Sequence, residues 1–223
     1  MGKVILLLLF SLLLGQNDPV LLSIRADALK SGIPEQYLNK TFKHSGITIH
    51  DQILDRFAKP YEKKSWAEYR KLFVTESRIK EGSSFYKIHY KTLKNISDNI
   101  KIDPFLILSI VGVESNFGRH KGKFTVFNSL YTQIMKMPKR SKWAKKEMIE
   151  YLLYCYKDKV SPHSILGSYA GAFGYGQFIP SSYNTYAIDG NDDGIRKPYD
   201  WSDVFASIGN YLVKNGYPTS DPT

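Results

Sequence analysis

Cysteine is almost absent from this 223-residue chain, in which Cys155 is the only one. An intrachain disulfide is therefore excluded, although the N-terminus has features of an exported protein. Cys155 lies in the apolar helical run EYLLYCYK, and we predict that it is buried as a small hydrophobic residue. No cysteine directly follows Gly15, so there is no acceptor for the lipid of a lipoprotein.

Long apolar runs are also scarce. The strongest one, Val4–Leu14, follows Lys3 and is too short to span a bilayer. This pattern predicts a signal peptide over residues 1–15, cleaved near Gly15-Gln16, although leucine occupies the third position before the cut, where small residues are preferred. An uncleaved N-terminal anchor is the alternative. We therefore expect an exported protein of the periplasm or cell envelope, which contacts a membrane only if this segment is retained.

Signatures of nucleic-acid binding, phosphate-binding loops, internal repeats and low-complexity linkers are lacking as well. Lys and Arg number 31 against 21 Asp and Glu, which gives a net charge of +10. The basic residues are scattered, so they favour general attraction to anionic wall polymers or membrane surfaces over base recognition. With 43% hydrophobic residues the chain can bury a core, and we expect one monomeric domain without a nucleic-acid partner.

What the sequence does contain is a helical pattern up to about residue 160. Apolar residues recur at helical spacing, which predicts short helices over 21–29 and 35–42, amphipathic helices within 65–100 and a long helix over 141–157. The remainder is rich in glycine and aromatic residues. We therefore predict a mainly α (α+β) fold with a cleft between a helical body and a loop or strand element.

The run VGVESNFGR places Glu114 at the end of an apolar helix. That helix begins with the N-cap Asp103 and with Pro104 at the first helical position, followed by FLILSIVGV. Apolar residues on nearly every side predict that the helix is buried together with Glu114. Burial and the negative end of the helix dipole both favour the protonated carboxyl, which can then act as a general acid. A structural glutamate hydrogen-bonded to loop amides is the alternative.

A second candidate segment, GSYAGAFGYGQFIPSSY, spans residues 167–183. Its glycines permit sharp turns and a close approach of the backbone to a ligand, and aromatic faces such as that of Tyr175 pack against sugar rings. Ser168 and Gln177 are the polar groups of this stretch able to orient a substrate or to hold Glu114. The alternative is a glycine-rich hairpin that packs its aromatic residues into the core.

The segment DGNDDGIRKPYD has the spacing of a twelve-residue calcium loop of the EF-hand type, over 189–200. Gly194 occupies the turn position, and the closing residue is Asp rather than Glu, which shortens its reach and weakens binding. The predicted ligands of a structural Ca²⁺ or Na⁺ are Asp189, Asn191, Asp193, the carbonyl of Ile195, and Asp200. A plain Asx-rich turn is the alternative.

Together these three segments resemble the membrane-bound lytic transglycosylase B family and its soluble relatives, enzymes that cleave the glycan strands of peptidoglycan. The resemblance extends from about Ile24, through SGIPEQYL, to Gly216-Tyr217, with the segments in the family's order and spacing. It implies a lysozyme-like helical catalytic domain over 20–217, with a small glycine- and aromatic-rich lobe and an EF-hand-like loop at 189–200. It also implies that the partner is the peptidoglycan glycan strand.

Carried over residue by residue, the resemblance makes Glu114 the sole catalytic acid and base, with Ser168 and Gln177 in contact with the substrate near it. Tyr211 in GNYLVKNGY matches a cleft tyrosine. Lys139-Arg140 matches a basic pair that faces the peptide stem, with Lys in place of one Arg. The pair therefore has one guanidinium fewer that can bind a carboxylate through two hydrogen bonds. Without the resemblance, this pair would be interpreted as part of a solvated loop.

The resemblance departs from the family at the C-terminal end. Relatives continue with a helix that carries a Tyr-Asn pair lining the cleft, whereas residues 218–223 resemble only the start of a helix that is missing. Without that helix we expect Tyr211, Leu212 and Tyr217 to be partly exposed, and activity to suffer more than the fold.

Ordinary glycosidases use two carboxylates, but the motifs here offer Glu114 alone. The acids of the 189–200 loop are assigned to the metal, and Glu147 and Glu150 to a helix surface. The family's mechanism needs no cofactor: Glu114 protonates the glycosidic oxygen between MurNAc and GlcNAc, then accepts the proton of the MurNAc 6-hydroxyl, which attacks C1. The product is a 1,6-anhydro sugar. The alternatives are a hydrolytic muramidase and a peptidoglycan-binding protein without turnover.

Overall fold

The computed structural model describes residues 18–58 and 65–219. The expected signal peptide (1–15) and residues 220–223 lie outside this part of the chain. The described helices and strands are α2 (Pro19–Lys30), α3 (Glu35–Phe42), α4 (Gln52–Ala58), α5 (Trp66–Phe73), α6 (Glu76–Ile100), α7 (Pro104–Ser115), β1 (Phe124–Thr125), α8 (Val126–Lys136), α9 (Pro138–Lys157), β2 (Leu166–Gly167), α10 (Pro180–Tyr186) and α11 (Trp201–Lys214). Within these ranges no helix is both long enough and apolar enough to cross a membrane.

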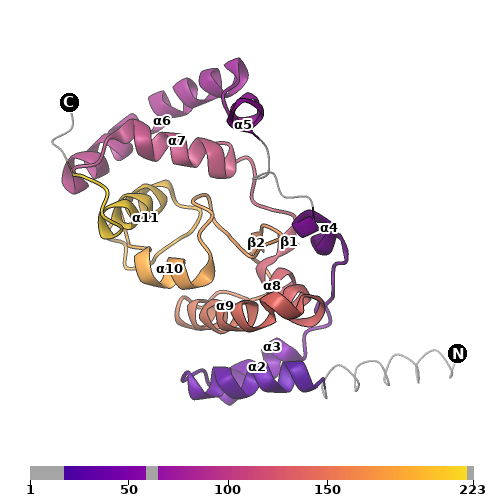
Figure 1. Cartoon of the computed structure of the whole chain (residues 1–223). Coiled ribbons are helices and arrows are strands. Elements are labelled where there is room, and N and C mark those ends of the chain that lie inside the picture. The colour runs from indigo at the N-terminus through magenta and orange to yellow at the C-terminus, as the bar shows by residue number, and fades with distance from the viewer. Residues whose placement is uncertain (1–17, 59–64, 220–223) are drawn as a thin grey trace, which may run out of the picture.

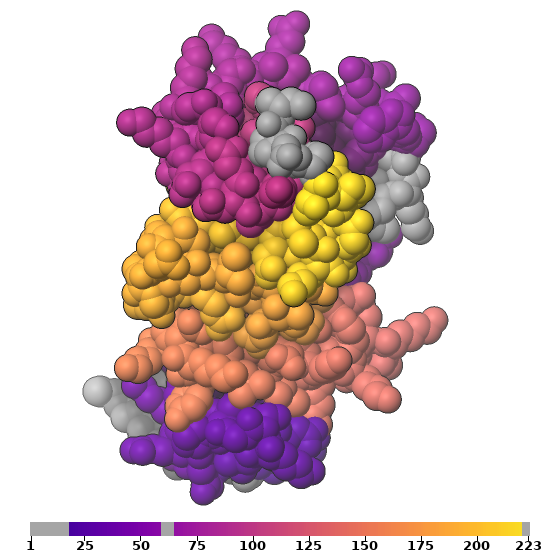
Figure 2. All heavy atoms as spheres, turned by 90° about the vertical axis from the view of Figure 1, so that its left-hand side faces the viewer, coloured from indigo at the N-terminus to yellow at the C-terminus, as the bar shows by residue number. Residues whose placement is uncertain are grey.

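The helices stack in layers from one end of the molecule to the other (Figures 1 and 2). The helices α5, α6 and α7 form one end, and α10 and α11 lie next to them. Below these, α8 and α9 form a further layer, and α2 and α3 form the opposite end. The mainly helical fold predicted from the sequence is confirmed.

The first hydrophobic core lies between α2, α3, α8 and α9. Most of α8 is inside it, because every residue from Val126 to Ile134 is buried. Asp18 caps α2 and ties it to α8, since its carboxylate accepts the amide of Val20 at 2.8 Å and the hydroxyl of Tyr131 at 3.0 Å. The predicted burial of Cys155 in this core is confirmed, and burial raises the pKa of its thiol to about 12.

The second hydrophobic core joins α6, α7 and α11. Two glycines let the ring of Phe117 enter it, because a Cβ on Gly82 or on Gly112 would lie 2.9 Å from Cζ of that ring. Phe85 of α6 then contacts both Phe117 and Trp201, with ring centroids 5.3 and 4.7 Å apart. The aromatic residue that follows α7 therefore fastens the C-terminal end of this helix to α6.

The segment between the two cores carries the antiparallel pair of β1 and β2, in which Phe124 lies opposite Gly167. Close approach at Gly122 makes this pairing possible, because a Cβ there would lie 1.9 Å from the carbonyl oxygen of Gly167. The next amide, of Lys123, donates to the same oxygen at 3.1 Å. The strand pair thereby joins the loop after α7 to the glycine-rich segment after β2.

Two helix predictions need correction. The long helix begins at Pro138 rather than near residue 141, because proline takes its first position. Helices also continue beyond residue 160, where α10 starts at Pro180 and α11 is capped by Asp200, whose carboxylate accepts two amides of the first turn. The predicted change to loops or strands is therefore wrong for these two helices. Asp200 was interpreted as a metal ligand, which concealed its role as an N-cap.

Candidate active site

Glu114 lies in the last turn of α7, where the chain reverses sharply. Asn116, Phe117 and Gly118 follow in left-handed conformations, with φ of +49°, +56° and +82°. Ser115 holds this reversal, because its Oγ accepts the amide of Gly118 at 3.1 Å. Left-handed backbone at non-glycine residues is strained, and such strain is concentrated at functional sites. The end of α7 is therefore a candidate for the site.

The sequence pattern predicted that α7 is buried on every side, and this prediction was wrong. Ile107 and Val111 are buried in the second core, whereas Phe105, Val113 and Glu114 are exposed. The reason is that α6 and α11 pack against only part of this helix. Apolar residues on its remaining face stay outside the core.

The carboxyl of Glu114 nevertheless has a raised pKa, and the cause is desolvation by the surrounding protein. Exposure and desolvation are compatible, because protein can fill the space on one side of a side chain while water touches the other. The described residues offer this carboxylate no hydrogen bond or ion pair. The alternative of a structural glutamate tied to loop amides is therefore not supported. A carboxyl with a raised pKa keeps its proton to a higher pH and can give it to a ligand.

Tyr175 lies against the turn that follows Glu114. A Cβ on Gly118 would be 3.1 Å from a ring atom of Tyr175 and 2.7 Å from one of Trp201, and these two rings stack with centroids 4.3 Å apart. Lys121, in the same loop, places its Nζ 5.7 Å from the centre of the Tyr175 ring. The structure thus brings an aromatic face and a cation next to the turn that carries the candidate acid.

Lys121 is a residue that sequence reasoning missed. Its Nζ also lies 5.3 Å from the centre of the Tyr199 ring. The signal was the run RHKGK directly after the Glu114 motif, which was counted among scattered basic residues. Arg119 of this run pairs with Glu81 at 2.5 Å, whereas Lys121 has no acidic partner in the part of the chain that the structure describes. A cation in this position suits an anionic group of a ligand.

The 167–178 segment divides between core and surface, so the interpretation as a hairpin that packs aromatic residues into the core holds for part of it. Phe173 is fully buried and forms backbone bridges to both ends of the segment. Ser168 holds the first turn, because its Oγ accepts two amides at 3.2 and 3.1 Å. Gln177 has a left-handed backbone with φ +48°, and its Nε2 donates to the carbonyl of Gly174 at 2.8 Å. The hydroxyl proton of Ser168 and Oε1 of Gln177 have no partner among the described residues.

Lys139 and Arg140 lie in the first turn of α9, rather than in the solvated loop that would be assumed without the resemblance. Lys139 is exposed, whereas Arg140 is half-buried. The guanidinium carbon of Arg140 lies 4.7 Å from the ring centre of Phe57 and 4.3 Å from that of Trp143. Its Nε donates to Oε1 of Gln133 at 3.0 Å. Arg140 is therefore held by residues of α4, α8 and α9.

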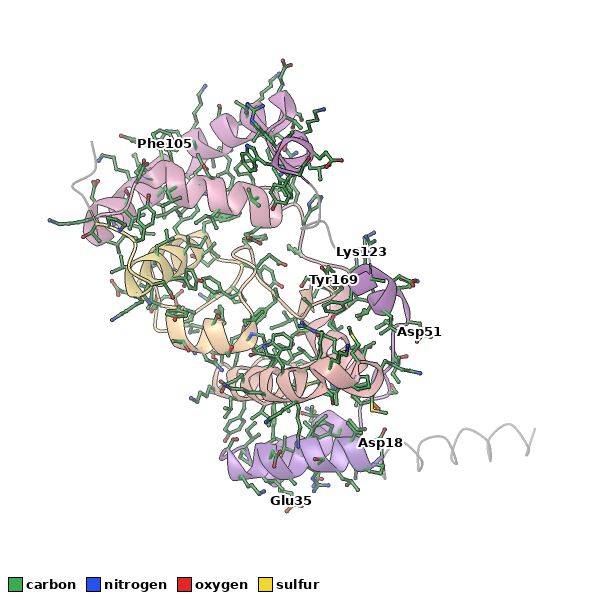
Figure 3. The ribbon with its side chains drawn as sticks, viewed as in Figure 1. Asp18, Glu35, Asp51, Phe105, Lys123 and Tyr169 are labelled. Atoms are coloured by element: carbon green, nitrogen blue, oxygen red, sulfur yellow. The ribbon has the colours of Figure 1, made fainter. Side chains whose placement is uncertain are left out.

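Gln133 connects Arg140 to the glycine-rich segment. Its Nε2 donates to the carbonyl of Tyr169 at 3.3 Å, and the ring of Tyr169 meets that of Phe57 edge-on at 4.8 Å. Figure 3 shows Tyr169 near Lys123, beside the strands. Sequence reasoning missed Gln133 because a glutamine within a helical pattern belongs to no motif. The structure thus joins the basic residue and the aromatic segment.

Tyr211 lies on α11, with its ring 5.9 Å from that of Phe178 and 5.0 Å from that of Tyr186. Tyr211 and Tyr217 are 39% and 44% exposed, and Leu212 is partly buried. Tyr211 therefore meets the glycine-rich segment at its Phe178 end. That a further helix would cover these side chains stays a prediction.

The 189–200 loop uses its first carboxylate to hold its own backbone. Asp189 accepts the amides of Asn191 and Asp193 at 3.2 Å and that of Gly194 at 2.6 Å. These are the bonds of an Asx-rich turn. The carboxylate oxygens of Asp189 therefore face into the loop, where a cation would have to meet them.

The other predicted ligands also have partners. Asp193 accepts the amide of Ile195 at 3.0 Å and forms an ion pair with Lys197, and Asp200 caps α11. Within the described ranges no group of three or more His, Cys, Asp or Glu side chains is arranged to hold a metal ion. The predicted EF-hand-like site is therefore not confirmed by this structure.

Glu147 requires another correction, because it is buried rather than exposed on a helix surface. Its carboxylate accepts the amide and the hydroxyl of Ser181 at 2.9 and 2.8 Å, which ties α9 to the start of α10. Glu150 accepts Nδ2 of Asn184 at 2.8 Å. Both carboxylates are therefore engaged in helix packing.

Comparison with known proteins agrees with this geometry. The Transglycosylase SLT domain family matches residues 16–223. The membrane-bound lytic murein transglycosylase B of Escherichia coli (strain K12) is 34% identical over 157 residues, which are 70% of this chain and 44% of that protein.

Solved structures superpose on most of the chain. The soluble lytic transglycosylase SltB1 of Pseudomonas aeruginosa has a TM-score of 0.84 and 33% identity, over 92% of this chain and 69% of its own. Slt35 of Escherichia coli, solved with calcium, has a TM-score of 0.83 and 29% identity, over 92% and 65%. SltB3 of Pseudomonas aeruginosa, solved with NAG-NAM-pentapeptide, has a TM-score of 0.82 and 28% identity, over 90% and 53%.

The chain thus spans less than half of the curated relative and between 53% and 69% of these solved structures. The predicted lysozyme-like helical fold is confirmed by these superpositions. The matched residues include the end of α7, the glycine-rich segment and the 189–200 loop. From these matches and from the arrangement around Glu114, the chain belongs to the transglycosylase SLT domain family.

Proposed function

We propose that this chain is a peptidoglycan lytic transglycosylase that cleaves the β-1,4 bond between MurNAc and GlcNAc. The observation that carries the proposal is the carboxyl of Glu114, whose pKa is raised by desolvation, with no charged group of the described residues contributing to the shift. An ordinary glycosidase holds a second carboxylate within about 5–9.5 Å, and the charge of that group would add to the shift. A single carboxyl favours a reaction whose nucleophile belongs to the substrate itself.

In the proposed reaction, Glu114 donates its proton to the glycosidic oxygen as the bond from this oxygen to C1 of MurNAc breaks. The 6-hydroxyl of the same MurNAc then forms a new bond to C1, and its proton passes to the Glu114 carboxylate. The products are a 1,6-anhydro end and a GlcNAc with a free 4-hydroxyl, and no water is consumed. Holding the hydroxyl near C1 makes the attack intramolecular, which supplies roughly 7 kcal/mol in favourable cases.

We propose that the glycan strand contacts Ser168, Gln177, Tyr175 and Tyr211. The hydroxyl proton of Ser168 and Oε1 of Gln177 lack partners in the described chain, so both can bond to sugar hydroxyls or amides. Tyr175 supports this role because it lies against the turn after Glu114 and presents an aromatic ring. Tyr211 meets the same segment from α11.

Peptide stems carry carboxylates, and we propose that Lys139 and Arg140 meet them. Lys139 is exposed in the first turn of α9, and Arg140 has two aromatic neighbours and Gln133 to hold its guanidinium in place. A guanidinium fixed in this way binds a carboxylate with little further loss of entropy. We assign Lys121 the same kind of role next to Tyr175 of the glycine-rich segment.

Digestion of purified sacculi, followed by mass spectrometry of the released muropeptides, tests the proposed function. Anhydro products, each lighter by one water than the hydrated form, are the expected result. Hydrated products would instead identify a muramidase that uses water. Binding to sacculi without release of fragments would identify a peptidoglycan-binding protein without turnover.

We propose that the 189–200 loop binds a structural Ca²⁺, with Na⁺ as a weaker alternative, and that catalysis needs no cofactor. The loop offers hard oxygen donors at the calcium-loop spacing, and Slt35 was solved with calcium. The ion pair of Asp193 with Lys197 supports the proposal that the carboxylate of Asp193 attracts a cation. The ammonium group of Lys197 would have to leave before Ca²⁺ could reach Asp193.

Thermal unfolding in millimolar calcium, compared with unfolding in a chelator, checks this site. Calcium should raise Tm, because a ligand present at a hundredfold excess over its Kd stabilises the native state by about 2.7 kcal/mol. Asp193→Ala should remove the rise in Tm. Lys197→Met should show the same rise at lower calcium concentrations than the unsubstituted protein. Equal Tm values in calcium and in chelator for the unsubstituted protein would contradict the site.

We propose that the protein acts as an exported monomer of the periplasm or cell envelope, with the catalytic domain over 20–217. The N-terminal pattern of Lys3 followed by an apolar run supports export. The net charge of +10 supports attraction to anionic wall polymers. Fractionation of cells that express the full chain checks the location.

A further inference from the structure

A long groove lies between α6 and α7, on the face of α7 that the second core leaves uncovered. Its volume is about 550 Å³, and its walls are mainly apolar. Figure 3 shows Phe105, one of its lining residues, in the layer that α6 and α7 form. The exposed apolar side chains that line this groove, which we call the α6–α7 groove, are Val74, Ile79, Phe105 and Val113. Exposed apolar surface concentrated in one concavity marks an interaction site.

Arg78 supplies a second, independent observation. Its guanidinium lines the α6–α7 groove and lies 5.2 Å from the centre of the Phe73 ring. The Nη1 atom of Arg78 is buried, yet it finds no acceptor among the described residues. Buried guanidinium nitrogens normally have partners, because an unsatisfied one is destabilising. The guanidinium of Arg78 thus has no carboxylate partner in the described chain, and the part of it that lines the groove can pair with an anionic group of an occupant.

The charges around the groove indicate the sign of that acceptor. Arg78 and Lys87 both line it, and no acidic residue does so in the described part of the chain. The hydroxyls of Ser83 and Ser109 already donate to carbonyls of their own helices, at 3.0 and 2.6 Å. An occupant with a carboxylate would thus complement the groove, because it can accept from Arg78.

The walls indicate the shape of the occupant. Both are α-helices whose backbone groups bond within the helix, so an extended peptide would find no strand edge to pair with. A flat bilayer surface cannot fill a concave groove between two helices. The distance from Phe105 to Val113 along α7 is about 12 Å, which corresponds to two turns of a helix laid alongside. An amphipathic helix can fill such a groove with side chains at positions i, i+3, i+4 and i+7.

We propose that the α6–α7 groove is the docking site of an amphipathic α-helix, supplied by a polypeptide partner, that places a carboxylate against Arg78. Val113 and Phe117, which lie on either side of Glu114 in the chain, both line the groove. A helix bound there would pack against the turn that carries this residue. This last consequence rests on the proposed function, whereas the docking itself does not.

The test is a display selection with random 18-residue peptides on the full chain, followed by fluorescence anisotropy of the enriched peptides. We expect peptides with an apolar helical stripe and an Asp or Glu beside it. Arg78→Met should weaken their binding about tenfold or more, because a hydrogen bond to a charged group is lost. Ile79→Asp should abolish binding.

Ile88→Asp is the matched control, because Ile79 and Ile88 are both exposed residues of α6, at 59% and 76%, and only Ile79 lines the α6–α7 groove. It should leave peptide binding unchanged, and circular dichroism should show all variants folded. The proposal is overturned if no peptide is enriched, if the enriched peptides lack the acidic residue or the helical stripe, or if Arg78→Met binds them as well as the unsubstituted protein. It is also overturned if the unsubstituted chain binds anionic vesicles or forms a dimer and Ile79→Asp abolishes that vesicle binding or dimerisation rather than peptide binding. Because binding is the readout, these outcomes are independent of lytic activity.

Discussion

Glu114→Gln is expected to abolish the release of muropeptides from sacculi while leaving glycan binding nearly intact. Glutamine keeps the shape of the side chain but has no proton to give to the glycosidic oxygen. Among the residues that the structure describes, no other carboxylate contributes to the pKa of Glu114, which supports its role as the sole acid. We expect a loss of at least a hundredfold in rate, since general acid–base catalysis contributes about 10²–10⁴-fold.

The measurement is the initial rate of sacculus digestion, together with sedimentation of the protein with sacculi to measure binding. Glu76→Gln, in the exposed first turn of α6, is the matched control and should keep the full rate. A folded Glu114→Gln protein that retained more than a small fraction of the rate would exclude Glu114 as the acid.

The pH dependence of the same reaction follows from the raised pKa of Glu114. A carboxyl with a raised pKa stays protonated to a higher pH than an ordinary glutamate does. The proton needed for the first step is therefore present below that pKa and is lost as the pH rises through it. We expect the rate to fall on the alkaline side, and a rate that rose steadily across this range would contradict the role of Glu114 as an acid.

Glu147→Ala is expected to have the largest effect on stability. Glu147 is 2% exposed, and its carboxylate accepts two hydrogen bonds from Ser181, at the N-terminus of α10. Each bond to a charged group contributes about 1.5–3 kcal/mol, and alanine leaves both donors unsatisfied beside a cavity. We expect the free energy of unfolding to fall by about 3 kcal/mol or more.

Chemical denaturation measures this difference, with Glu150→Ala as the control on the same helix. Nδ2 of Asn184 donates both to the Glu150 carboxylate and to the Glu150 carbonyl, so it keeps a partner when the side chain is removed. The control should therefore lose only about 0.5–1.5 kcal/mol. Equal losses in the two variants would show that Glu147 does not hold α9 and α10 together.

Several features of the site could be predicted from short stretches of sequence. The start of α7 is an example: Asp103 accepts the amide of Phe105 at 2.7 Å and Pro104 takes the first position, as predicted. Such signals are local, because a cap and the first turn lie within a few residues of each other. For the same reason, the position of Glu114 in the last turn of its helix was predicted correctly.

The errors concern burial and partners, which depend on residues far away in the chain. Glu147 was placed on a surface because its own helix does not reveal that α10 will pack over it. Without the resemblance Arg140 would have been assigned to a solvated loop, because its own segment does not reveal that Phe57 and Gln133 hold it. Asp200 shows a different conflict, because the same residue type serves as an N-cap and as a calcium ligand.

The sequence by itself determined the helix starts, the position of Glu114, and the resemblance to the family to which the chain belongs. Only the tertiary structure decided that α7 is covered on one side and that, within the described ranges, no charged neighbour contributes to the pKa of Glu114. It also decided that Arg78 lines a groove without a carboxylate partner among the described residues. The physical reason is the range of the forces involved. Backbone conformation and capping depend on neighbours within a turn, whereas desolvation, ion pairing and packing depend on which distant surfaces meet.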